Sequence, residues 1–492
     1  MSRQKAQLLG LDDEQLSQLR QQLSPQIRLV SDSRQIRPGD WFFAYPGNEA
    51  DGRDFIAQAV ANGAVRIIYE DSPHFRIKEY GVPGHPVKQL AKVAGILASE
   101  LLANTNSTLK VIGVTGTNGK TSITQWLAQA LQWLGTSAAI VGTNGNGFWG
   151  QLHKTANTTP DAITLQNLIH QFSQQGAQYL TLEVSSHGLQ EGRVSGVHFT
   201  TAVFTNLTHE HLDYHGTLEQ YFSVKKSLFY WPQLQHAIIN QDNAYGRRLI
   251  AGLRSDNPEI SITSYGFTVE ADIYIEKVDF SLEGMQVAMR TPWGQGVVGS
   301  SLLGTFNAEN LAATVGVLCG LGYTLSQVTA ALSQIQPALG RMQTLRYEGC
   351  PLVVVDYAHT PDALKNVLQA LHPLRKKEGK IWCVFGCGGN RDRRKRPLMG
   401  KVVQENADYA VITSDNPRTE EAQAIIREIL PVSNAVLLEA DRERAIAYAI
   451  KHAAQQDIVL IAGKGHETYQ EIAGVKYPFD DVEVARRYLE AN

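Results

Sequence analysis

The sequence is poor in cysteine and has no large excess of charge of either sign. Its 492 residues contain four cysteines, whose spacing is not that of a zinc site and which are too few for a disulfide framework. Cys319, Cys350, Cys383 and Cys387 are therefore predicted to pack in the core of a protein kept in a reducing compartment. The formal net charge of −3 gives no electrostatic reason to expect nucleic acid as the main partner.

Long uncharged apolar runs are also missing. No segment reaches the length of a membrane span, and the first residues are polar and of mixed charge, without the apolar centre of a signal peptide. These absences favour a cytoplasmic protein with no membrane insertion. The chain is too long for one ordinary hydrophobic core, and its length suggests about three domains.

What the sequence does contain is a glycine-rich loop between two apolar segments. Residues 113–122 read Gly-Val-Thr-Gly-Thr-Asn-Gly-Lys-Thr-Ser, and apolar residues at helical spacing follow as far as Leu134. A strand, a loop and a helix start in this order turn backbone N–H groups towards anions, and Lys120 adds a positive charge. Thr121 can offer a hydroxyl to Mg²⁺. The first glycine stands one position before its place in the general P-loop pattern, so we predict a variant phosphate loop, with an ordinary glycine turn as the alternative.

Polar residues also follow two other apolar runs of this region. The run 179–184 carries Glu183 at its end, and the run 201–205 leads to histidines at 209, 211 and 215. Open α/β sheets bind ligands at the carboxyl ends of their strands, so these groups are expected at one sheet edge. Mg²⁺ shared with a nucleotide is favoured there because it prefers oxygen ligands. Zinc bound by the histidines remains an alternative.

The flanking regions also show α/β patterns. Residues 1–105 include an aromatic strand at 41–44 and a helical stretch at 55–61, and residues 255–300 predict short strands of a peripheral sheet. After a linker at 337–341, helical stretches lie between most of the predicted strands at 352–355, 381–385, 409–413, 436–438 and 458–462. This is a doubly wound pattern. The basic run 391–396 is predicted to be a solvated loop or one that binds an acidic ligand.

Five motifs in order make the chain resemble the Mur ligase family, ATP-dependent enzymes that form amide bonds in peptidoglycan synthesis. They are Thr115–Thr121, Asn157–Pro160, Glu183–Leu189, His211–Gly216 and Asp356–Pro361. The resemblance covers essentially the whole chain and implies an α/β protein of three domains. These would be a small N-terminal domain that binds the UDP-substrate (1–105), a central P-loop ATPase-like domain (106–337) and a C-terminal Rossmann-like, doubly wound domain that binds the amino acid (338–492).

The resemblance also implies roles for individual residues. The catalytic set would be Lys120, Glu183, His211 and Lys225, with Mg²⁺ held by Thr121, Glu183, His211 and Lys225. Lys225, on its own a surface lysine, is expected to be an N6-carboxylysine. The ATP-binding residues would be Gly116, Thr117, Asn118, Gly119, Lys120, Thr121, Ser122, Asn307, Asn310, Arg341 and His359. The UDP-substrate would contact Ser33, Asn48, Glu49, Ala50, Asn157, Thr158, Thr159, Ser185 and Arg193.

Within the family, the stretch 415–418 is associated with meso-diaminopimelate rather than lysine as the added amino acid. The far end of diaminopimelate carries a carboxylate and an ammonium, so its pocket needs a cation and an acceptor together, and Arg418 could bind the carboxylate as a fork. The pocket would comprise Arg391, Asp415, Asn416, Pro417, Arg418, Gly463 and Glu467. Glu191 departs from the family, where glutamine is frequent, and receives no role.

The resemblance therefore implies a ligase that joins meso-2,6-diaminopimelate to UDP-N-acetylmuramoyl-L-alanyl-D-glutamate through an acyl phosphate. ATP would be the co-substrate, Mg²⁺ the cofactor, and a monomer the expected state. Three alternatives remain: a sibling ligase that adds L-lysine, a folylpolyglutamate synthetase, and a nucleotide-binding regulatory module without catalysis.

Overall fold

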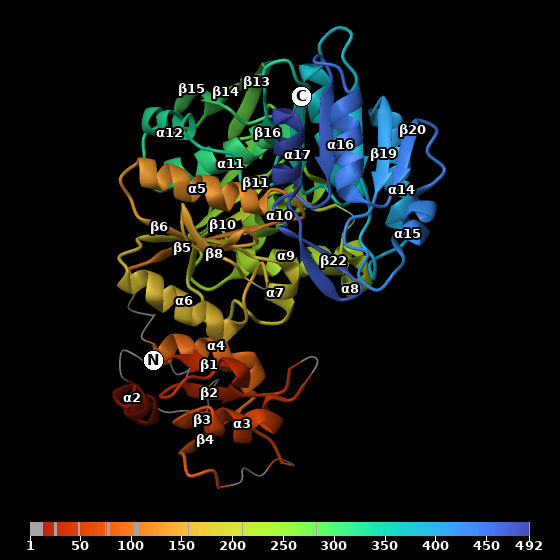
Figure 1. Ribbon diagram of the computed structural model, residues 1–492. Coiled ribbons are helices and arrows are strands. Elements are labelled where there is room, and N and C mark those ends of the chain that lie inside the picture. Colours follow the sequence, from red (N-terminus) through yellow and green to blue (C-terminus); the bar gives the residue numbers. More distant parts are fainter. Residues whose placement is uncertain are drawn as a thin grey trace.

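The computed structural model describes residues 13–23, 27–47, 50–73, 75, 79–102, 108–155, 157–208, 210–281 and 283–491. These residues form three α/β domains, with the middle domain between the other two (Figure 1). This arrangement confirms the predicted fold class. Within the described residues, no helix has the length and apolar character that a bilayer span requires.

The first domain is built on a parallel sheet of four strands in the order β1-β2-β3-β4. The strands are β1 (Leu29–Val30), β2 (Trp41–Ala44), β3 (Arg66–Asp71) and β4 (Gly84–Lys88), and the helices are α2 (Asp13–Gln21), α3 (Ile56–Ala61) and α4 (Leu90–Leu101). The predicted aromatic strand and the helix after it are confirmed. Helix α4 runs directly against the middle domain, because a Cβ on Gly95 would lie 2.2 Å from the carbonyl oxygen of Ser195.

The middle domain contains a sheet of eleven strands in the order β15-β14-β13-β12-β11-β10-β5-β9-β6-β7-β8. The strands are β5 (Lys110–Thr115), β6 (Ala138–Gly142), β7 (Gly145–Phe148), β8 (Gln151–His153), β9 (Tyr179–Glu183), β10 (Phe199–Phe204), β11 (His236–Asn240), β12 (Ser261–Gly266), β13 (Ile273–Ser281), β14 (Gly284–Thr291) and β15 (Gly294–Ser300). The helices are α5 (Lys120–Trp133), α6 (Ala162–Gln174), α7 (Ser186–Gln190), α8 (Leu212–His215), α9 (Leu218–Lys226), α10 (Ala244–Asp256), α11 (Thr305–Gly320) and α12 (Leu325–Leu332).

Two apolar cores cover the two faces of this sheet. Helices α5, α11 and α12 contribute to one core, and α6 and α10 contribute to the other. The strands predicted within residues 255–300 are present, but the prediction that they form a peripheral sheet is wrong. Strand β12 pairs in parallel with β11, so β12 to β15 continue the central sheet to its edge.

The third domain has the predicted doubly wound pattern. Its sheet has the order β16-β17-β21-β18-β19-β20, in which β16 alone pairs antiparallel. The strands are β16 (Gln343–Leu345), β17 (Leu352–Asp356), β18 (Ile381–Phe385), β19 (Tyr409–Thr413), β20 (Ala435–Glu439) and β21 (Ile458–Ala462). The helices are α13 (Pro361–Leu371), α14 (Lys395–Asn406), α15 (Ala422–Ile429), α16 (Arg442–His452) and α17 (Asp481–Glu490), and a hairpin is formed by β22 (Tyr469–Ile472) and β23 (Val475–Pro478).

Loops of the middle and third domains contact one another. Asn144 Nδ2 donates to the carbonyl of Leu339 at 3.2 Å, and Lys154 Nζ contacts Thr468 Oγ1 at 2.9 Å. His359, which follows β17, lies 3.8 Å from Glu210, which follows β10. The carboxyl ends of strands in two sheets therefore face a shared site.

Candidate active site

The phosphate loop lies between β5 and α5, as predicted. Gly116 and Gly119 have φ of +146° and +91°, which side chains disfavour. Neither position has room for a Cβ, which would lie 1.8 Å from Thr205 Oγ1 at Gly116 and 2.5 Å from Asn310 Oδ1 at Gly119. The segment after β10 braces the loop, because Asn206 accepts bonds from the N–H groups of Thr117 and Asn118 at 2.8 and 2.9 Å.

Lys120 is held by the loop itself. Its Nζ donates to the carbonyls of Gly116 and Thr117 at 2.9 and 2.7 Å. Burial lowers the pKa of Lys120, while the nearby charges of Glu210 and Glu183 oppose this shift. Its charge is balanced by carbonyl dipoles rather than by a carboxylate in contact, which leaves the ammonium able to receive an anionic ligand.

Glu183 joins the phosphate loop to the substrate side of the site. Its Oε2 accepts from the hydroxyls of Thr121 and Thr143, both at 3.0 Å, and its Oε1 accepts from the Thr143 N–H at 2.9 Å. Gly142 lets this carboxylate approach, since a Cβ there would lie 2.2 Å from Oε1. The predicted metal-binding pair of Thr121 and Glu183 is thus brought into direct contact.

Lys225 is buried, contrary to what its sequence context alone indicated. It comes from α9, its residue is 1 % exposed, and its Nζ donates to the Gly116 carbonyl at 2.9 Å. Burial and the neighbouring charge of Lys120 hold the pKa of Lys225 well below its usual range, against the opposing charge of Glu210. A lowered pKa increases the share of neutral amine at a given pH, and the neutral amine is the form that can react with an electrophile such as CO₂.

His211 begins the segment that continues into α8, and its backbone has φ of +56°. Its ring meets the ring of His187 edge to face at a centroid distance of 4.9 Å. Burial lowers the pKa of His211 to about 4 despite the nearby charge of Glu210. The neutral imidazole can therefore act as a metal ligand at neutral pH.

Glu210 is a site residue that the sequence reasoning did not assign. Its two oxygens lie 3.8 Å from Nε2 of His211 and 3.8 Å from Nε2 of His359, so it bridges two domains. Burial would raise its pKa, but His211, His359, Lys120 and Lys225 together lower it. The sequence did offer a signal for Glu210, because this carboxylate stands between two histidines after the end of a predicted strand.

Oxygen atoms of the kind that Mg²⁺ takes as ligands meet beside the phosphate loop. Among the described residues, no three His, Cys, Asp or Glu side chains are grouped so that they could hold a metal ion. His209, one of the three histidines considered for zinc, lies outside the described residues. The Thr121 hydroxyl and the Glu183 carboxylate supply these oxygens, while the His211 ring lies against the ring of His187. Mg²⁺ suits such a place because it commonly takes one or two carboxylates, with phosphate oxygens and water as further ligands.

The predicted nucleotide contacts gather around the same loop. Asn307 and Asn310 lie on α11, and Asn310 Nδ2 donates to Asn307 Oδ1 at 3.1 Å. Arg341 comes from the linker, with its guanidinium 4.6 Å from the ring centroid of Tyr357 and one nitrogen 3.4 Å from Thr121 Oγ1. Arg341 Nε is buried and has no hydrogen-bond partner within the described residues.

The residues predicted for the UDP-linked substrate divide into two groups. Thr159 Oγ1 donates to the Glu183 carbonyl at 2.8 Å and contacts Ser185 Oγ at 3.0 Å, and Thr158 contacts Thr143 at 3.0 Å. Asn157 lies just before them, its carbonyl bonded to Thr155 Oγ1.

The second group lies in the first domain. It includes Ser33 and Ala50, and Ser33 Oγ donates to Gln58 at 2.8 Å. Asn48 and Glu49 lie outside the described residues.

The unexpected Glu191 is paired rather than free. Its Oε2 accepts from Arg193 Nε at 2.8 Å, and Arg193 also donates to the Thr159 carbonyl at 3.0 Å. Arg193 thus offsets the charge of the additional carboxylate.

The predicted amino-acid pocket is assembled from three strand ends of the third domain. Residues 415–418 follow β19, Arg391 follows β18, and Gly463 and Glu467 follow β21. Gly388 lies between two of the cations, because a Cβ there would be 3.0 Å from Arg418 NH1 and 3.8 Å from Arg391 Cγ. Arg418 has φ of +54° and donates to the Gly389 carbonyl at 2.7 Å. Asn416 Nδ2 donates to Glu467 Oε2 at 2.7 Å.

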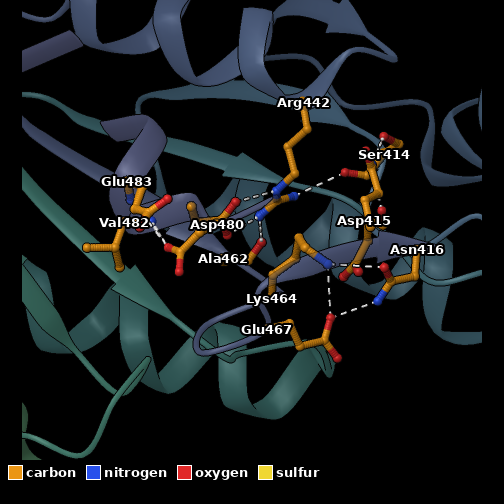
Figure 2. A network of polar contacts seen from close by, with 12 residues as sticks. Ser414, Asp415, Asn416, Arg442, Ala462, Lys464, Glu467, Asp480, Val482 and Glu483 are labelled. Carbon is orange, nitrogen blue, oxygen red and sulfur yellow. Dashed lines mark hydrogen bonds and ion pairs between the residues drawn. The ribbon is translucent and has the colours of Figure 1, made fainter. Parts of the chain in front are cut away.

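Two buried arginines beneath this pocket were missed. Arg396 was expected in a solvated or ligand-binding loop, which is wrong, because its side chain is 0 % exposed and pairs with Glu420 and Glu428 at 2.8 and 2.7 Å. The Arg396 bonds lower the pKa of Glu420 to about 2. Arg442 pairs with Asp481 at 2.7 Å and donates to the carbonyls of Ser414 and Ala462, thereby joining two pocket loops (Figure 2).

Comparison with known proteins gives consistent matches along the chain. Residues 28–101 match the family described as "Mur ligase family, catalytic domain", 114–318 the "Mur ligase middle domain", and 340–465 the "Mur ligase, glutamate ligase domain".

Individual proteins are similar over almost the full length. A UDP-N-acetylmuramoyl-L-alanyl-D-glutamate--2,6-diaminopimelate ligase of Neisseria meningitidis serogroup B is 52 % identical, covering 94 % of each chain. The protein of the same name in Chromobacterium violaceum is 49 % identical over 99 % of each chain. A solved structure of a ligase of that name is 38 % identical, with a TM-score of 0.68 over 94 % of each chain.

Proposed function

Since the chain belongs to the Mur ligase family, we propose that it joins meso-2,6-diaminopimelate to UDP-N-acetylmuramoyl-L-alanyl-D-glutamate, with ATP converted to ADP and phosphate. The observation that carries this proposal is the arrangement of Arg418 and Glu467. They lie on two different loops, and Asn416, on the loop of Arg418, donates a hydrogen bond to Glu467. This arrangement offers a cation and a carboxylate to a substrate end that has one charge of each sign. The names of relatives about half identical to the chain support the same reaction.

The reaction would take place in two stages. First, the γ-carboxylate of the D-glutamate residue attacks the γ-phosphoryl group of ATP, which gives an acyl phosphate and ADP. Then the amine of diaminopimelate attacks the acyl carbon, the amide forms, and phosphate leaves. Phosphoryl transfer depends mostly on positioning and on charge stabilisation. Lys120 would provide both at the phosphate end.

Thr121, Glu183, His211 and a carboxylated Lys225 would hold Mg²⁺, which when bound supplies positive charge to the phosphate oxygens. The depressed pKa of Lys225 supports the carboxylation, because only the neutral amine adds to CO₂. Carboxylation would replace a buried cation by an anion and so change the charge next to Lys120.

The remaining roles follow the three domains, taken as residues 1–105, 106–337 and 338–492. Ser33, Asn48, Glu49 and Ala50 would meet the UDP end of the substrate. Asn157, Thr158, Thr159, Ser185 and Arg193 would hold its muramoyl-peptide part. Asn307, Asn310, Arg341 and His359 would bind the nucleotide. Arg391, residues 415–418, Gly463 and Glu467 would bind diaminopimelate. The contact of Glu210 with His359 would help exclude water from the acyl phosphate.

We infer a monomer that acts in the cytoplasm, where ATP and UDP-activated precursors occur.

A phosphate-release assay with one substrate omitted at a time tests the proposal. Release should require ATP, the UDP-muramoyl dipeptide and meso-diaminopimelate together. Equal turnover with L-lysine would contradict the assignment of diaminopimelate and favour a lysine-adding sibling. Turnover of a folate substrate would favour a folylpolyglutamate synthetase. ATP binding without ligation in a folded preparation would favour a regulatory module.

A further inference from the structure

Lys464 lies directly after Gly463 in the third domain and is not one of the residues proposed to bind a substrate. Its side chain is 0 % exposed, and a buried ammonium is costly unless its donors are satisfied. Its Nζ lies 3.0 Å from Glu467 Oε2 and 3.1 Å from Asn416 Oδ1. Figure 2 shows the nitrogen pointing between these two side chains. Lys464 therefore connects two residues of the amino-acid pocket from behind.

This lysine also fixes the orientation of the Asn416 amide. Asn416 Oδ1 accepts from Lys464 Nζ and from the backbone N–H of Glu471, at 3.1 and 3.0 Å. Both groups can only donate, so the amide oxygen must face them. The amide nitrogen is then directed at Glu467, where Nδ2 donates to Oε2 at 2.7 Å.

The two oxygens of Glu467 are consequently not equivalent. Oε2 accepts from both Lys464 and Asn416, which lie on the buried side. Oε1 has no hydrogen-bond donor within the described part of the chain, and the side chain is 18 % exposed. Oε1 is therefore the atom that the pocket can offer to the ammonium of a ligand.

We propose that Lys464 is a positioning residue that sets amino-acid specificity by acting through Glu467; this rests on the proposed function. Together Lys464 and Glu467 present an oriented acceptor with little net charge. That suits the far end of diaminopimelate, whose ammonium and carboxylate sum to zero. Without Lys464, Glu467 would keep an uncompensated negative charge, which attracts the lone ammonium of lysine and repels the carboxylate of diaminopimelate.

The experiment measures kcat and KM for meso-diaminopimelate and for L-lysine, with each product resolved by mass. Lys464→Met should raise the KM for diaminopimelate about tenfold or more, because a bond to a charged group is lost. The ratio of kcat/KM for diaminopimelate to that for lysine should fall at least about tenfold, since the charge change acts oppositely on the two. The KM for ATP should stay within about twofold, because within the described residues Lys464 Nζ bonds to Asn416 and Glu467 and to none of the residues proposed to bind ATP.

The matched control is Lys476→Met. Both lysines lie over the ring of Tyr469, with Nζ 5.6 Å from its centroid for Lys464 and 4.4 Å for Lys476, but Lys476 is exposed on β23. Its replacement should leave the specificity ratio unchanged. If Lys464→Met does not fold, Lys464→Gln keeps a donor without the charge and should still lower the ratio.

A double-mutant cycle tests the route through Glu467. In a Glu467→Gln background, Lys464→Met should add less than about a threefold change in KM for diaminopimelate, because coupled residues are not additive. Full additivity, or equal losses with both amino acids, would overturn the inference while the ligase function stands. Wild-type protein that does not ligate diaminopimelate would overturn both.

Discussion

The two ends of the site treat their buried cations in opposite ways. At the phosphate loop, Lys120 and Lys225 donate to carbonyl oxygens and the pKa of each is lowered by burial. In the third domain, Arg396, Arg442 and Lys464 lie within 3.0 Å of carboxylates. Although burial opposes it, Asp481 raises the pKa of Arg442. The buried cations of the third domain are thus paired with carboxylates, whereas those at the phosphate loop bond to neutral carbonyl groups.

This difference reflects what each end has to do. Under the proposed function the phosphate loop receives anions that arrive, change and leave during the reaction, which suits cations that have no carboxylate in contact among the described residues. Under the same proposal the amino-acid pocket keeps a fixed shape around a charged substrate, which suits loops held together by buried pairs. Substitutions at the two ends should therefore have effects of different kind.

The largest expected effect is the loss of ligation in Lys225→Ala. We expect kcat to fall about a thousandfold or more, because a charged group at the transferred phosphoryl is removed. Phosphate release in the presence of all substrates measures it, and short carboxylic acids should restore part of the rate if a carbamate acts there. Lys226→Ala is the control, since Lys226 lies over the ring of Tyr230 and not at the loop. Full activity of Lys225→Ala would remove that residue from the mechanism.

The next effect is on the stability of the third domain. Arg442→Met leaves Asp481 buried without its partner, and both side chains are 0 % exposed in the native protein. We expect the free energy of unfolding of this domain to fall by about 3–5 kcal/mol, which denaturant unfolding measures. A double variant that also carries Asp481→Leu should recover part of the loss. No recovery would mean that Arg442 acts through the Ser414 and Ala462 carbonyls alone.

For Lys225→Met we expect the opposite effect, a gain in stability, when the protein is unfolded in CO₂-free buffer. In the unfolded chain Lys225 binds a proton as the pH falls through its usual value of 10.5, but in the folded protein it stays neutral to a lower pH. The unfolded state then binds more protons, so the wild-type protein loses stability as the pH falls through this interval. Lys225→Met should therefore be more stable than wild type at neutral pH, with a smaller gain near pH 10. A gain in melting temperature that does not change with pH would contradict this explanation.

The smallest effect should come from the partly exposed pair of Glu191 and Arg193. Glu191 and Arg193 lie 2.6 Å apart and are 21 % and 22 % exposed. Because such pairs contribute little, Glu191→Gln should lower the KM for the UDP-muramoyl dipeptide by no more than about fivefold, by releasing Arg193 for the substrate. Initial rates at varied substrate concentration measure this change. An increase in KM would instead give Glu191 a binding role.

The sequence predicted the parts of the site whose signals are local. The phosphate loop, the strand ending at Glu183 and the strands of the third domain each combine turn residues with an apolar run, and the structure has them. The sequence missed residues whose role depends on distant partners. Arg396 pairs with Glu420, 24 residues away, and Arg442 with Asp481, 39 residues away. Lys464 lies between the predicted pocket residues Gly463 and Glu467 in the sequence, but its partner Asn416 is 48 residues distant. The residue roles and the domain boundaries remain predictions.

The central claim is tested most directly by one reaction with two competing amino acids. Wild-type protein, ATP and UDP-N-acetylmuramoyl-L-alanyl-D-glutamate are incubated with equal concentrations of meso-diaminopimelate and L-lysine, and the products are resolved by mass. The pocket of Arg418, Asn416 and Glu467 predicts the diaminopimelate adduct in large excess. A product that contains mainly lysine, or equal amounts of the two adducts, would contradict the account.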